Sequence, residues 1–200
     1  MRNDSEKHPL DQGIVGIDLG SRSTGNTVIC SWEQGRFVFH RAPEAANNDG
    51  WLLTRLRKLA AKAIYVDAPL SLPGAFFGKG SDHFFRLADK EAGGMSPMFL
   101  GGLTARAIQL AESIRAAGAI VHEAYPAALI RAEWKHLELK AGRAVPKQTV
   151  RLMAGTFQVP SPEPADRHEL DAWLCWLIGL RHVRGEAKVF GDPEEGAILA

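Results

Sequence analysis

The chain has little cysteine and no long apolar run. Its 200 residues include 2 cysteines, Cys30 in a strand-like run and Cys175 in an apolar helical run. This excludes a disulfide framework and a cysteine-rich metal cluster, and it favours buried thiols in a reducing compartment. The longest apolar run, Ala172 to Leu180, is about half as long as a membrane span requires. We therefore expect a cytoplasmic protein that does not enter a membrane.

The chain also lacks an excess of charge of either sign. Lys and Arg number 24 and Asp and Glu 23, which leaves a formal net charge of +1. A dedicated nucleic-acid coat protein is strongly basic, so that class is excluded, and any nucleic-acid binding must come from a local patch. The polar start, residues 1–12, is typical of a flexible tail before a single domain over residues 13–200.

Hydrophobic patterning predicts strands first and then alternating helices and strands. The expected strands are 14–19, 26–32, 36–41, 63–66 and 119–123. The expected helices are 50–63 with Asp49 as its N-cap, about 82–91, 103–114, 125–138, 146–156 and 167–182, with a polar loop at 140–146. Because a hairpin precedes the crossovers, we expect an α/β fold with a mixed sheet and helices on both faces.

Residues 68–102 are interrupted by ten Gly and Pro residues and predict a long inserted loop. Its apolar residues are Phe76, Phe77, Phe84, Phe85, Met95, Met98 and Phe99. They form either a lid packed on the core, which we favour, or an exposed surface for stacking, for a partner or for a second copy in a homodimer. Lys79, Arg86 and Lys90 are the expected phosphate contacts in this loop.

Three carboxylates stand where a predicted strand gives way to a loop. Asp18, Asp67 and Glu123 occupy these positions. Sheets of α/β proteins bind ligands beyond the carboxyl ends of their strands, so the three acids predict a common site. The structural alternative is that each acid caps a turn or the following helix.

Asp171 lies in a helix that is apolar on all sides, so its carboxylate is expected to be buried. Even a neutral polar group costs roughly 2–7 kcal/mol to bury without a partner, so Asp171 should become neutral, pair with a cation or bind a metal. Arg22, Arg167 or Lys90 is the alternative, structural partner. His168, three residues earlier, shares a helix face with Asp171 and is a candidate ligand or acid/base partner.

This set of acids suits phosphodiester hydrolysis with two divalent cations. Two hard cations about 4 Å apart stabilise charge on the attacking and leaving oxygens, and Mg²⁺ and Mn²⁺ prefer carboxylate oxygens. An acid on a central strand would bridge the two ions, while acids from a neighbouring strand and a facing helix would each complete one. Asp18, Asp67 and Asp171 provide that set.

Five motifs, in this order, carry a family resemblance. They are GIDLGS at 16–21, VDAPLSLP at 66–73, GGLTARAIQL at 101–110, EAYP at 123–126 and HELDAWLCWL at 168–177. The series resembles a bacterial and archaeal family of predicted nucleases with an RNase H-like fold and, more distantly, the RuvC-type resolvases. The resemblance implies a Mg²⁺- or Mn²⁺-dependent nuclease with Asp18, Asp67, His168 and Asp171 as ligands. Glu123 lies on the next strand, outside that core set.

Two other functions stay open. GIDLGS also resembles the first phosphate loop of the actin and hexokinase group, and this resemblance implies an ATP-binding ATPase or kinase. Those proteins hold the nucleotide between two such domains, whereas 200 residues provide one. Ser21, which ends the motif, is an expected substrate contact together with Lys79, Arg86 and Lys90. The second alternative is a noncatalytic module that binds nucleic acid or protein, in which the acids are structural caps.

Overall fold

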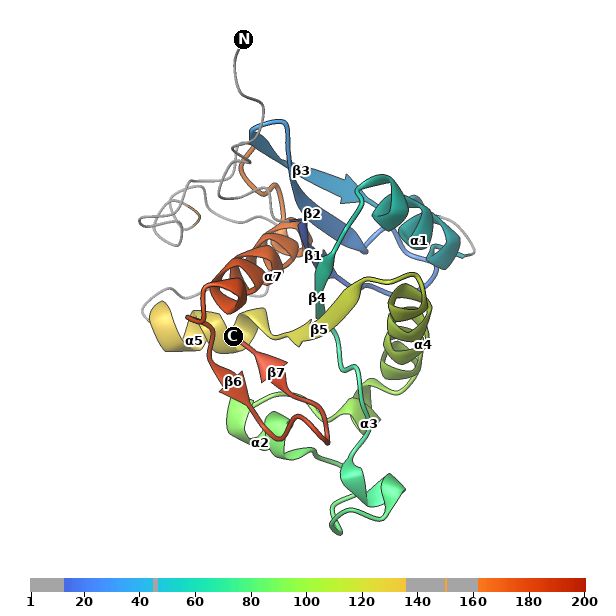
Figure 1. Ribbon diagram of the computed structural model, residues 1–200, viewed down its shortest axis with the longest axis vertical. Helices are drawn as coiled ribbons and strands as arrows, with labels where there is room; N and C mark the ends of the chain where they lie inside the picture. Colours follow the sequence, from blue (N-terminus) through green and yellow to red (C-terminus); the bar gives the residue numbers. More distant parts are fainter. Residues whose placement is uncertain (1–12, 45–46, 136–149, 151–161) are drawn as a thin grey trace.

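The computed structural model describes residues 13–44, 47–135, 150 and 162–200. Within them, one mixed sheet has the strand order β3-β2-β1-β4-β5-β7-β6. The strands are β1 (Ile14–Asp18), β2 (Val28–Glu33), β3 (Arg36–Arg41), β4 (Ala63–Asp67), β5 (Ile120–Ala124), β6 (Val189–Phe190) and β7 (Ile198–Leu199). Figure 1 shows β1 and β4 near the middle of this sheet.

Strand direction divides the sheet into a hairpin part and a parallel part. β2 pairs antiparallel with both β1 and β3, whereas β1, β4, β5 and β7 run parallel to one another. At the other edge of the sheet, β6 pairs antiparallel with β7. The β2–β3 turn places Gln34 at φ 49° and Gly35 at φ 82°. Two consecutive positive φ angles are typical of the tight hairpin turn that matches strand twist.

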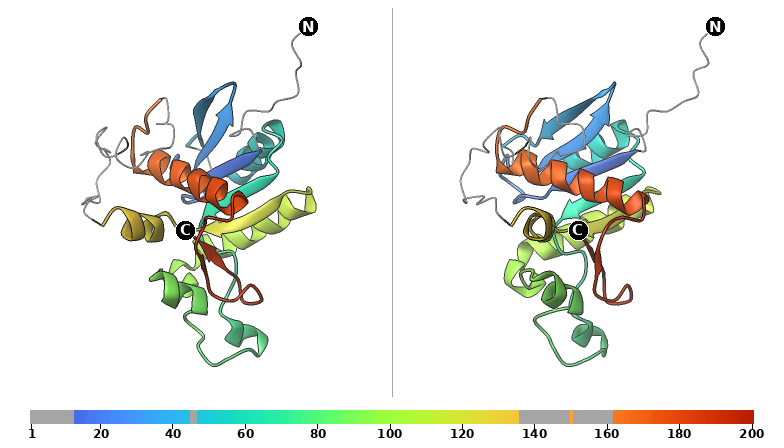
Figure 2. Two further views of the ribbon diagram at one scale, coloured as in Figure 1. Left: turned by 60° about the vertical axis from the view of Figure 1, so that its left-hand side comes forward. Right: turned by 90° about the vertical axis from the view of Figure 1, so that its left-hand side faces the viewer.

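Helices cover both faces of the sheet. They are α1 (Asp49–Lys58), η1 (Gly74–Phe77), α2 (Leu87–Ala92), α3 (Pro97–Leu100), α4 (Gly102–Ala116), α5 (Pro126–Glu133) and α7 (Arg167–Val183). One core packs α7 and α5 on one face of the sheet, and a second core packs α1 and α4 on the other. Figures 1 and 2 show these helices on opposite sides.

Helix α7 packs closely against β1 at Gly16. A Cβ atom on Gly16 would lie 2.1 Å from the carbonyl oxygen of Ala172 and 2.3 Å from the backbone nitrogen of Trp176. Glycine is therefore required at this position of β1, because any side chain would collide with helix backbone. The contact fixes the helix over the strand that ends in Asp18.

The predicted α/β class with a mixed sheet is confirmed, and both cysteines are free and buried. No strand is predicted from the sequence after residue 123, but the residues that follow α7 contribute β6 and β7 to the sheet. The short helix expected at about 82–91 is present as α2, and residues 68–102 also form η1 and α3, which the sequence does not predict. The tail 1–12, the loop 140–146 and nearly all of the helix predicted over 146–156 lie outside the described residues. Among the described helices, none is long and apolar enough to cross a membrane.

Asp49 does not cap α1 as predicted. Asn48 is the N-cap and makes no side-chain capping bond, while Asp49 is the first helical residue. The Asp49 carboxylate instead accepts a hydrogen bond from Arg106 Nε at 2.7 Å and pairs with Arg22 at 3.1 Å. Asp49 therefore ties α1 to α4 and to the loop after β1.

Candidate active site

The ends of β1 and β4 bring Asp18 and Asp67 side by side. The two residues are direct register partners in the parallel ladder. Side chains alternate along a strand, so Asp18 points to the same face as Gly16, which contacts α7. Asp67, as the register partner of Asp18, points to this face too. Two of the predicted carboxylates therefore meet beneath α7.

The first turns of α7 bring Asp171 and His168 to the same place. His168 Nδ1 lies 2.6 Å from Asp18 Oδ2, so helix and strand are joined by a direct bond. Arg167 Nε donates to Asp171 Oδ2 at 2.6 Å, one of the structural partners expected from the sequence. The side chains of Asp18 and Asp171 are 14% and 13% exposed. The predicted acids of the β1, β4 and α7 segments thus form one largely buried group.

Burial raises the pKa of each acid in this group, and repulsion from other members of the group adds to the rise for Asp67 and Asp171. The pKa of Asp67 is raised well above its usual value by burial and by the charges of Asp171 and Asp18. Burial likewise raises the pKa of Asp171 to about 6, against the opposing effect of Arg167. Burial also raises the pKa of Asp18, although its bond to His168 opposes the shift. These carboxylates lack enough positive charge around them.

The donor set fits a hard divalent cation. Asp171 Oδ1 is buried and has no hydrogen-bond partner, and the Asp67 carboxylate forms no hydrogen bond or ion pair within the described residues. A cation between these oxygens would satisfy both and relieve the repulsion. No three His, Cys, Asp or Glu side chains of the described ranges already surround one metal position. Asp18 and Asp171 are engaged by His168 and Arg167 instead.

A cavity of about 310 Å³ opens onto the paired strand ends. Asp18 and Asp67 line it together with apolar side chains that include Met95, Leu100 and Leu103. The other charged residues in its lining, Asp89 and Glu123, are also acidic. A ligand that enters this cavity therefore meets carboxylates and an apolar wall from the segment around α3.

Glu123 lines the same cavity as Asp18 and Asp67, and its charge contributes to the raised pKa of Asp67. However, its carboxylate is engaged by Arg86 and Leu70 and is not available as a ligand of the common site predicted for the three acids. Its register partner is Val66, whose side chain packs in the core on the α1 and α4 face. Strand alternation therefore directs Glu123 to the face opposite Asp67. There its carboxylate accepts two hydrogen bonds from Arg86, each 2.7 Å long, and one from the Leu70 backbone at 2.9 Å.

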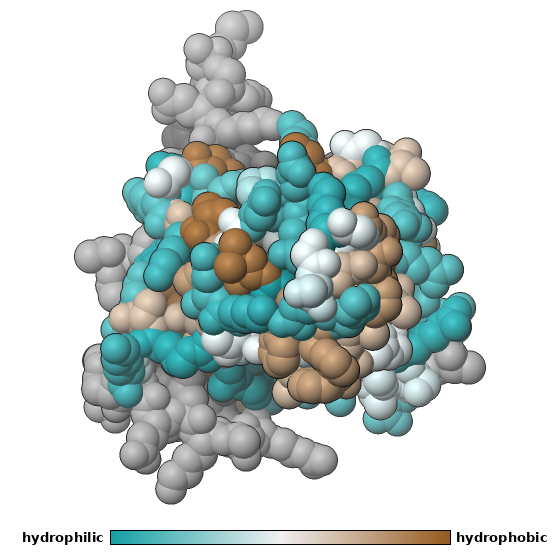
Figure 3. All heavy atoms as spheres, turned by 90° about the horizontal axis from the view of Figure 1, so that it is seen from below, coloured by the Kyte–Doolittle hydropathy of each residue, from teal (hydrophilic) through white to brown (hydrophobic). Residues whose placement is uncertain are grey.

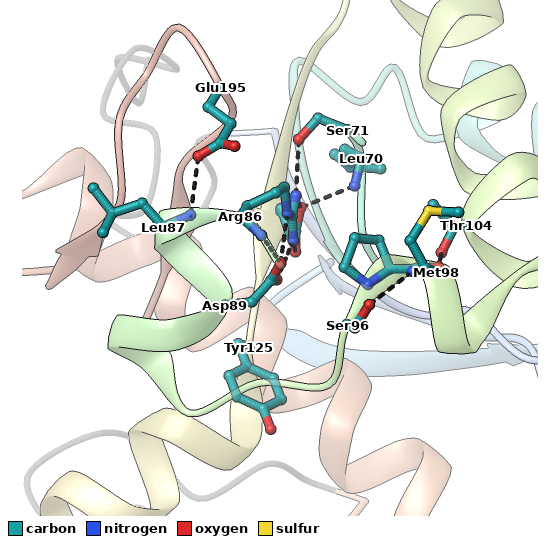
Figure 4. A network of polar contacts seen from close by, with 12 residues as sticks. Leu70, Ser71, Arg86, Leu87, Asp89, Ser96, Met98, Thr104, Tyr125 and Glu195 are labelled. Carbon is teal, nitrogen blue, oxygen red and sulfur yellow. Dashed lines mark hydrogen bonds and ion pairs between the residues drawn. The ribbon is translucent and has the colours of Figure 1, made fainter. Parts of the chain in front are cut away.

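Arg86 is likewise not the phosphate contact that the sequence suggested. Its side chain is 0% exposed, and its five N–H donors meet five acceptors on Ser71, Asp89 and Glu123. Figure 4 shows Arg86 between Asp89 and Ser71, with Leu70 beside the same network. No donor is left for a ligand. The network instead holds the segment that follows Asp67 against α2 and β5.

The remaining predicted substrate contacts, Ser21, Lys79 and Lys90, lie on the surface. Lys79 pairs with Glu194 at 3.0 Å and Lys90 with Asp82 at 2.6 Å. Exposed pairs of this kind are weak, so either lysine can exchange its partner for a phosphate. None of the three residues lines the cavity that contains Asp18 and Asp67.

The favoured interpretation of the apolar loop residues as a lid packed on the core is wrong for most of them. The exposed members, with their exposed fractions, are Phe76 (47%), Phe77 (68%), Phe84 (56%), Met95 (59%), Met98 (37%) and Phe99 (65%). Figure 3 views this end of the molecule and shows apolar areas separated by hydrophilic ones. The loop therefore presents aromatic rings to solvent beside the cavity.

Sequence reasoning missed Arg106. This arginine lies on the buried face of α4, where its side chain is 7% exposed and bonds to Asp49 and to the Gly20 carbonyl. A signal was present, because Leu103, Arg106 and Leu110 follow helical spacing and place a cation on an apolar face.

Comparison with known proteins does not add to this geometry. No protein-family model, no curated protein and no solved structure matches the chain. The function is therefore inferred from the arrangement of the residues.

Proposed function

We propose that this protein is a metal-dependent nuclease of RNase H-like fold, which hydrolyses phosphodiester bonds of nucleic acid at Asp18, Asp67 and Asp171. The observation that carries the proposal is the buried group of three carboxylates from β1, β4 and α7, in which Asp171 Oδ1 has no hydrogen-bond partner among the residues that the structure describes. Such a group costs free energy unless a cation occupies it. Mg²⁺ or Mn²⁺, in two positions, is the proposed cofactor.

The topology supports this fold assignment. An antiparallel hairpin, β1 to β3, adjoins the parallel strands β4 and β5, and α7 crosses the face that carries Asp18. This is the arrangement that the resemblance of the five sequence motifs implies. It places the first-strand acid, the fourth-strand acid and the last-helix acid at one edge of the sheet.

When bound, two divalent cations supply a hydroxide nucleophile and stabilise negative charge on the reacting phosphate. Asp18, which pairs in register with Asp67 and is bonded to His168 of α7, would contribute to both cation positions, while Asp67 and Asp171 would each contribute to one. Arg167 holds Asp171 through the Nε–Oδ2 bond and fixes the direction of its free Oδ1 atom.

His168 is the proposed acid/base residue of the site. The bond to Asp18 raises the pKa of His168, so the ring holds a proton more strongly than a free histidine does. A charged ring beside Asp18 compensates the charge of the carboxylate. His168 would be the group that donates a proton to the leaving oxygen.

The test is cleavage of labelled single-stranded, duplex, hybrid and branched nucleic acids with Mg²⁺ or Mn²⁺, by the wild type and by Asp18→Asn. Loss of an outer-shell partner alone costs about 10–100-fold, so loss of the bridging carboxylate should reduce the rate by about 100-fold or more. The matched control is Glu112→Gln, which removes an exposed carboxylate of α4 and should cleave as the wild type does.

Equal cleavage by Asp18→Asn and the wild type would refute the proposed function. Thermal stabilisation by ATP, without cleavage of any nucleic acid, would favour the ATP-binding alternative. Binding of nucleic acid that does not depend on metal or on Asp18, again without cleavage, would favour a noncatalytic module.

A further inference from the structure

A second cavity lies next to the acidic one. It has a volume of about 700 Å³ and lies between the loop after β1 and the start of α4. Leu19, Leu100 and Leu103 line both cavities, so the two are adjacent. The charged residues of the second cavity are Arg22, Arg106 and Asp49, whereas those of the first are all acidic. The two neighbouring cavities therefore differ in the sign of their charge.

Arg106 has hydrogen-bonding capacity that the fold does not use. Its Nε atom donates to Asp49 Oδ1 at 2.7 Å, and its Nη1 atom donates to the Gly20 carbonyl. The Nη2 atom is buried and has no acceptor within the described residues. A buried nitrogen that carries two N–H donors and part of a positive charge is seldom left without an acceptor. An anion in the cavity that Arg106 lines would supply one.

The start of α4 offers further donors to the same cavity. The N-cap of this 15-residue helix is Gly101, which has no side chain to accept a bond from the first turn. No acceptor of the described residues meets the backbone N–H groups of Gly102, Leu103 or Thr104. Gly102 and Leu103 line the cavity. The partial positive charge of a helix N-terminus adds to that of Arg106.

We infer that the second cavity binds a phosphate group of the nucleic-acid chain, next to the phosphate that is cleaved at Asp18 and Asp67. The inference rests on the proposed function, which places the reacting phosphate in the first cavity. A nucleic-acid strand carries regularly spaced phosphates, so a strand in the first cavity brings another phosphate to its neighbour. Arg106 and the start of α4 would hold the strand in register relative to the acids.

Gly102 permits a test that spares the fold. A Cβ atom built on Gly102 would meet nothing within 4 Å, so a side chain there enters open space in the cavity. Gly102→Asp introduces a negative charge that repels phosphate, whereas Gly102→Asn has the same shape without the charge. Asp is also favourable in the first turn of a helix, so Gly102→Asp should be at least as stable as Gly102→Asn.

The experiment measures binding without cleavage, in EDTA, with inorganic phosphate and with a short oligonucleotide as probes. We expect Gly102→Asp to bind both about tenfold more weakly than Gly102→Asn. The plot of log affinity against log salt concentration for the oligonucleotide should become less steep, by about the slope that one phosphate contact contributes. Oligonucleotides with and without a terminal phosphate show whether the phosphate bound in the second cavity is a terminal group or an internal linkage of the strand.

Equal binding of both probes by the two variants, with equal salt dependence, would overturn the phosphate site. If cleavage still depends on Asp18 in that case, the proposed nuclease function stands without it. If the wild type cleaves nothing but phosphate binding is lost in Gly102→Asp, the anion site is supported and the nuclease function is overturned.

Discussion

Replacement of Gly16 by alanine should disrupt both the core and the candidate active site. The added Cβ atom would lie 2.1 Å from the Ala172 carbonyl oxygen and 2.3 Å from the Trp176 backbone nitrogen. Ordinary contacts of a Cβ atom begin near 3.4 Å, so α7 must move away from β1 by roughly 1 Å. The obstacle is helix backbone, which cannot rotate aside as a flexible side chain can.

The free-energy cost of this movement comes from the contacts between α7 and β1 that it separates. A gap of 0.5–1 Å forfeits about a quarter to a half of the dispersion energy of the contacts that it separates. Overpacked cores typically lose about 1–3 kcal/mol, and a clash with backbone should fall at or above the upper end of that range. For a chain of this length, about 3 kcal/mol corresponds to a decrease in Tm of roughly 6–12 °C.

Urea denaturation of Gly16→Ala beside Gly50→Ala measures this effect. A Cβ atom on Gly50, in the first turn of α1, meets nothing within 4 Å, so that variant should keep or slightly raise the stability. Displacement of α7 would also lengthen the bond from His168 to Asp18 and reduce the proposed nuclease activity beyond the loss of folded protein. A Gly16→Ala protein within about 1 kcal/mol of wild type would refute this account of how α7 is positioned.

Two further predictions concern buried charge. Arg86→Met should destabilise the fold by about 3–5 kcal/mol, because Glu123 and Asp89 remain buried without their cation. The control is Lys90→Met, which removes an exposed ion pair, and equal urea midpoints for the two variants would contradict the prediction. The pKa of His122 is lowered to about 4 by burial and by the charges of His182 and Arg115. As the pH drops, the unfolded chain therefore binds the proton before the folded protein does. The stability should fall between about pH 6.5 and pH 4. In His122→Phe, the fall in the free energy of unfolding over this pH range should be smaller by about 1 kcal/mol, a modest value because solvent screens the partly exposed ring. The same pH profile in this variant and the wild type would contradict the assignment.

The acids of the candidate site are predictable because each rests on a local pattern. A short apolar run that ends in a carboxylate predicts Asp18 and Asp67, and parallel pairing then places them side by side. The cost of burying a carboxylate in an apolar helix predicts a partner for Asp171, which is Arg167 at 2.6 Å. Hydrophobic periodicity also suffices for the α/β class, since each major strand and helix spans five residues or more.

The remainder depends on contacts between distant residues. Glu123 and Arg86 are 37 residues apart, and no local pattern shows that one neutralises the other. Strand parity, which directs Glu123 away from Asp67, requires the register of β5 against β4, and the sequence does not specify that register. β6 and β7 are two residues long, too short for a period of two to be visible. Their place beside β5 is decided by tertiary packing.

The two buried arginines show why residue type alone misassigns a binding role. Arg86 lies in a loop with exposed aromatic rings and was the expected phosphate contact, yet its five donors are all bonded to protein acceptors. Arg106 lies on the apolar face of a helix, where a structural role is the ordinary expectation, yet its Nη2 atom has no acceptor in the described part of the chain. A guanidinium with every donor engaged can only stabilise the fold. One with donors left over, beside a cavity and a helix N-terminus, has the capacity to bind an anion, and this difference appears only when the acceptors are counted.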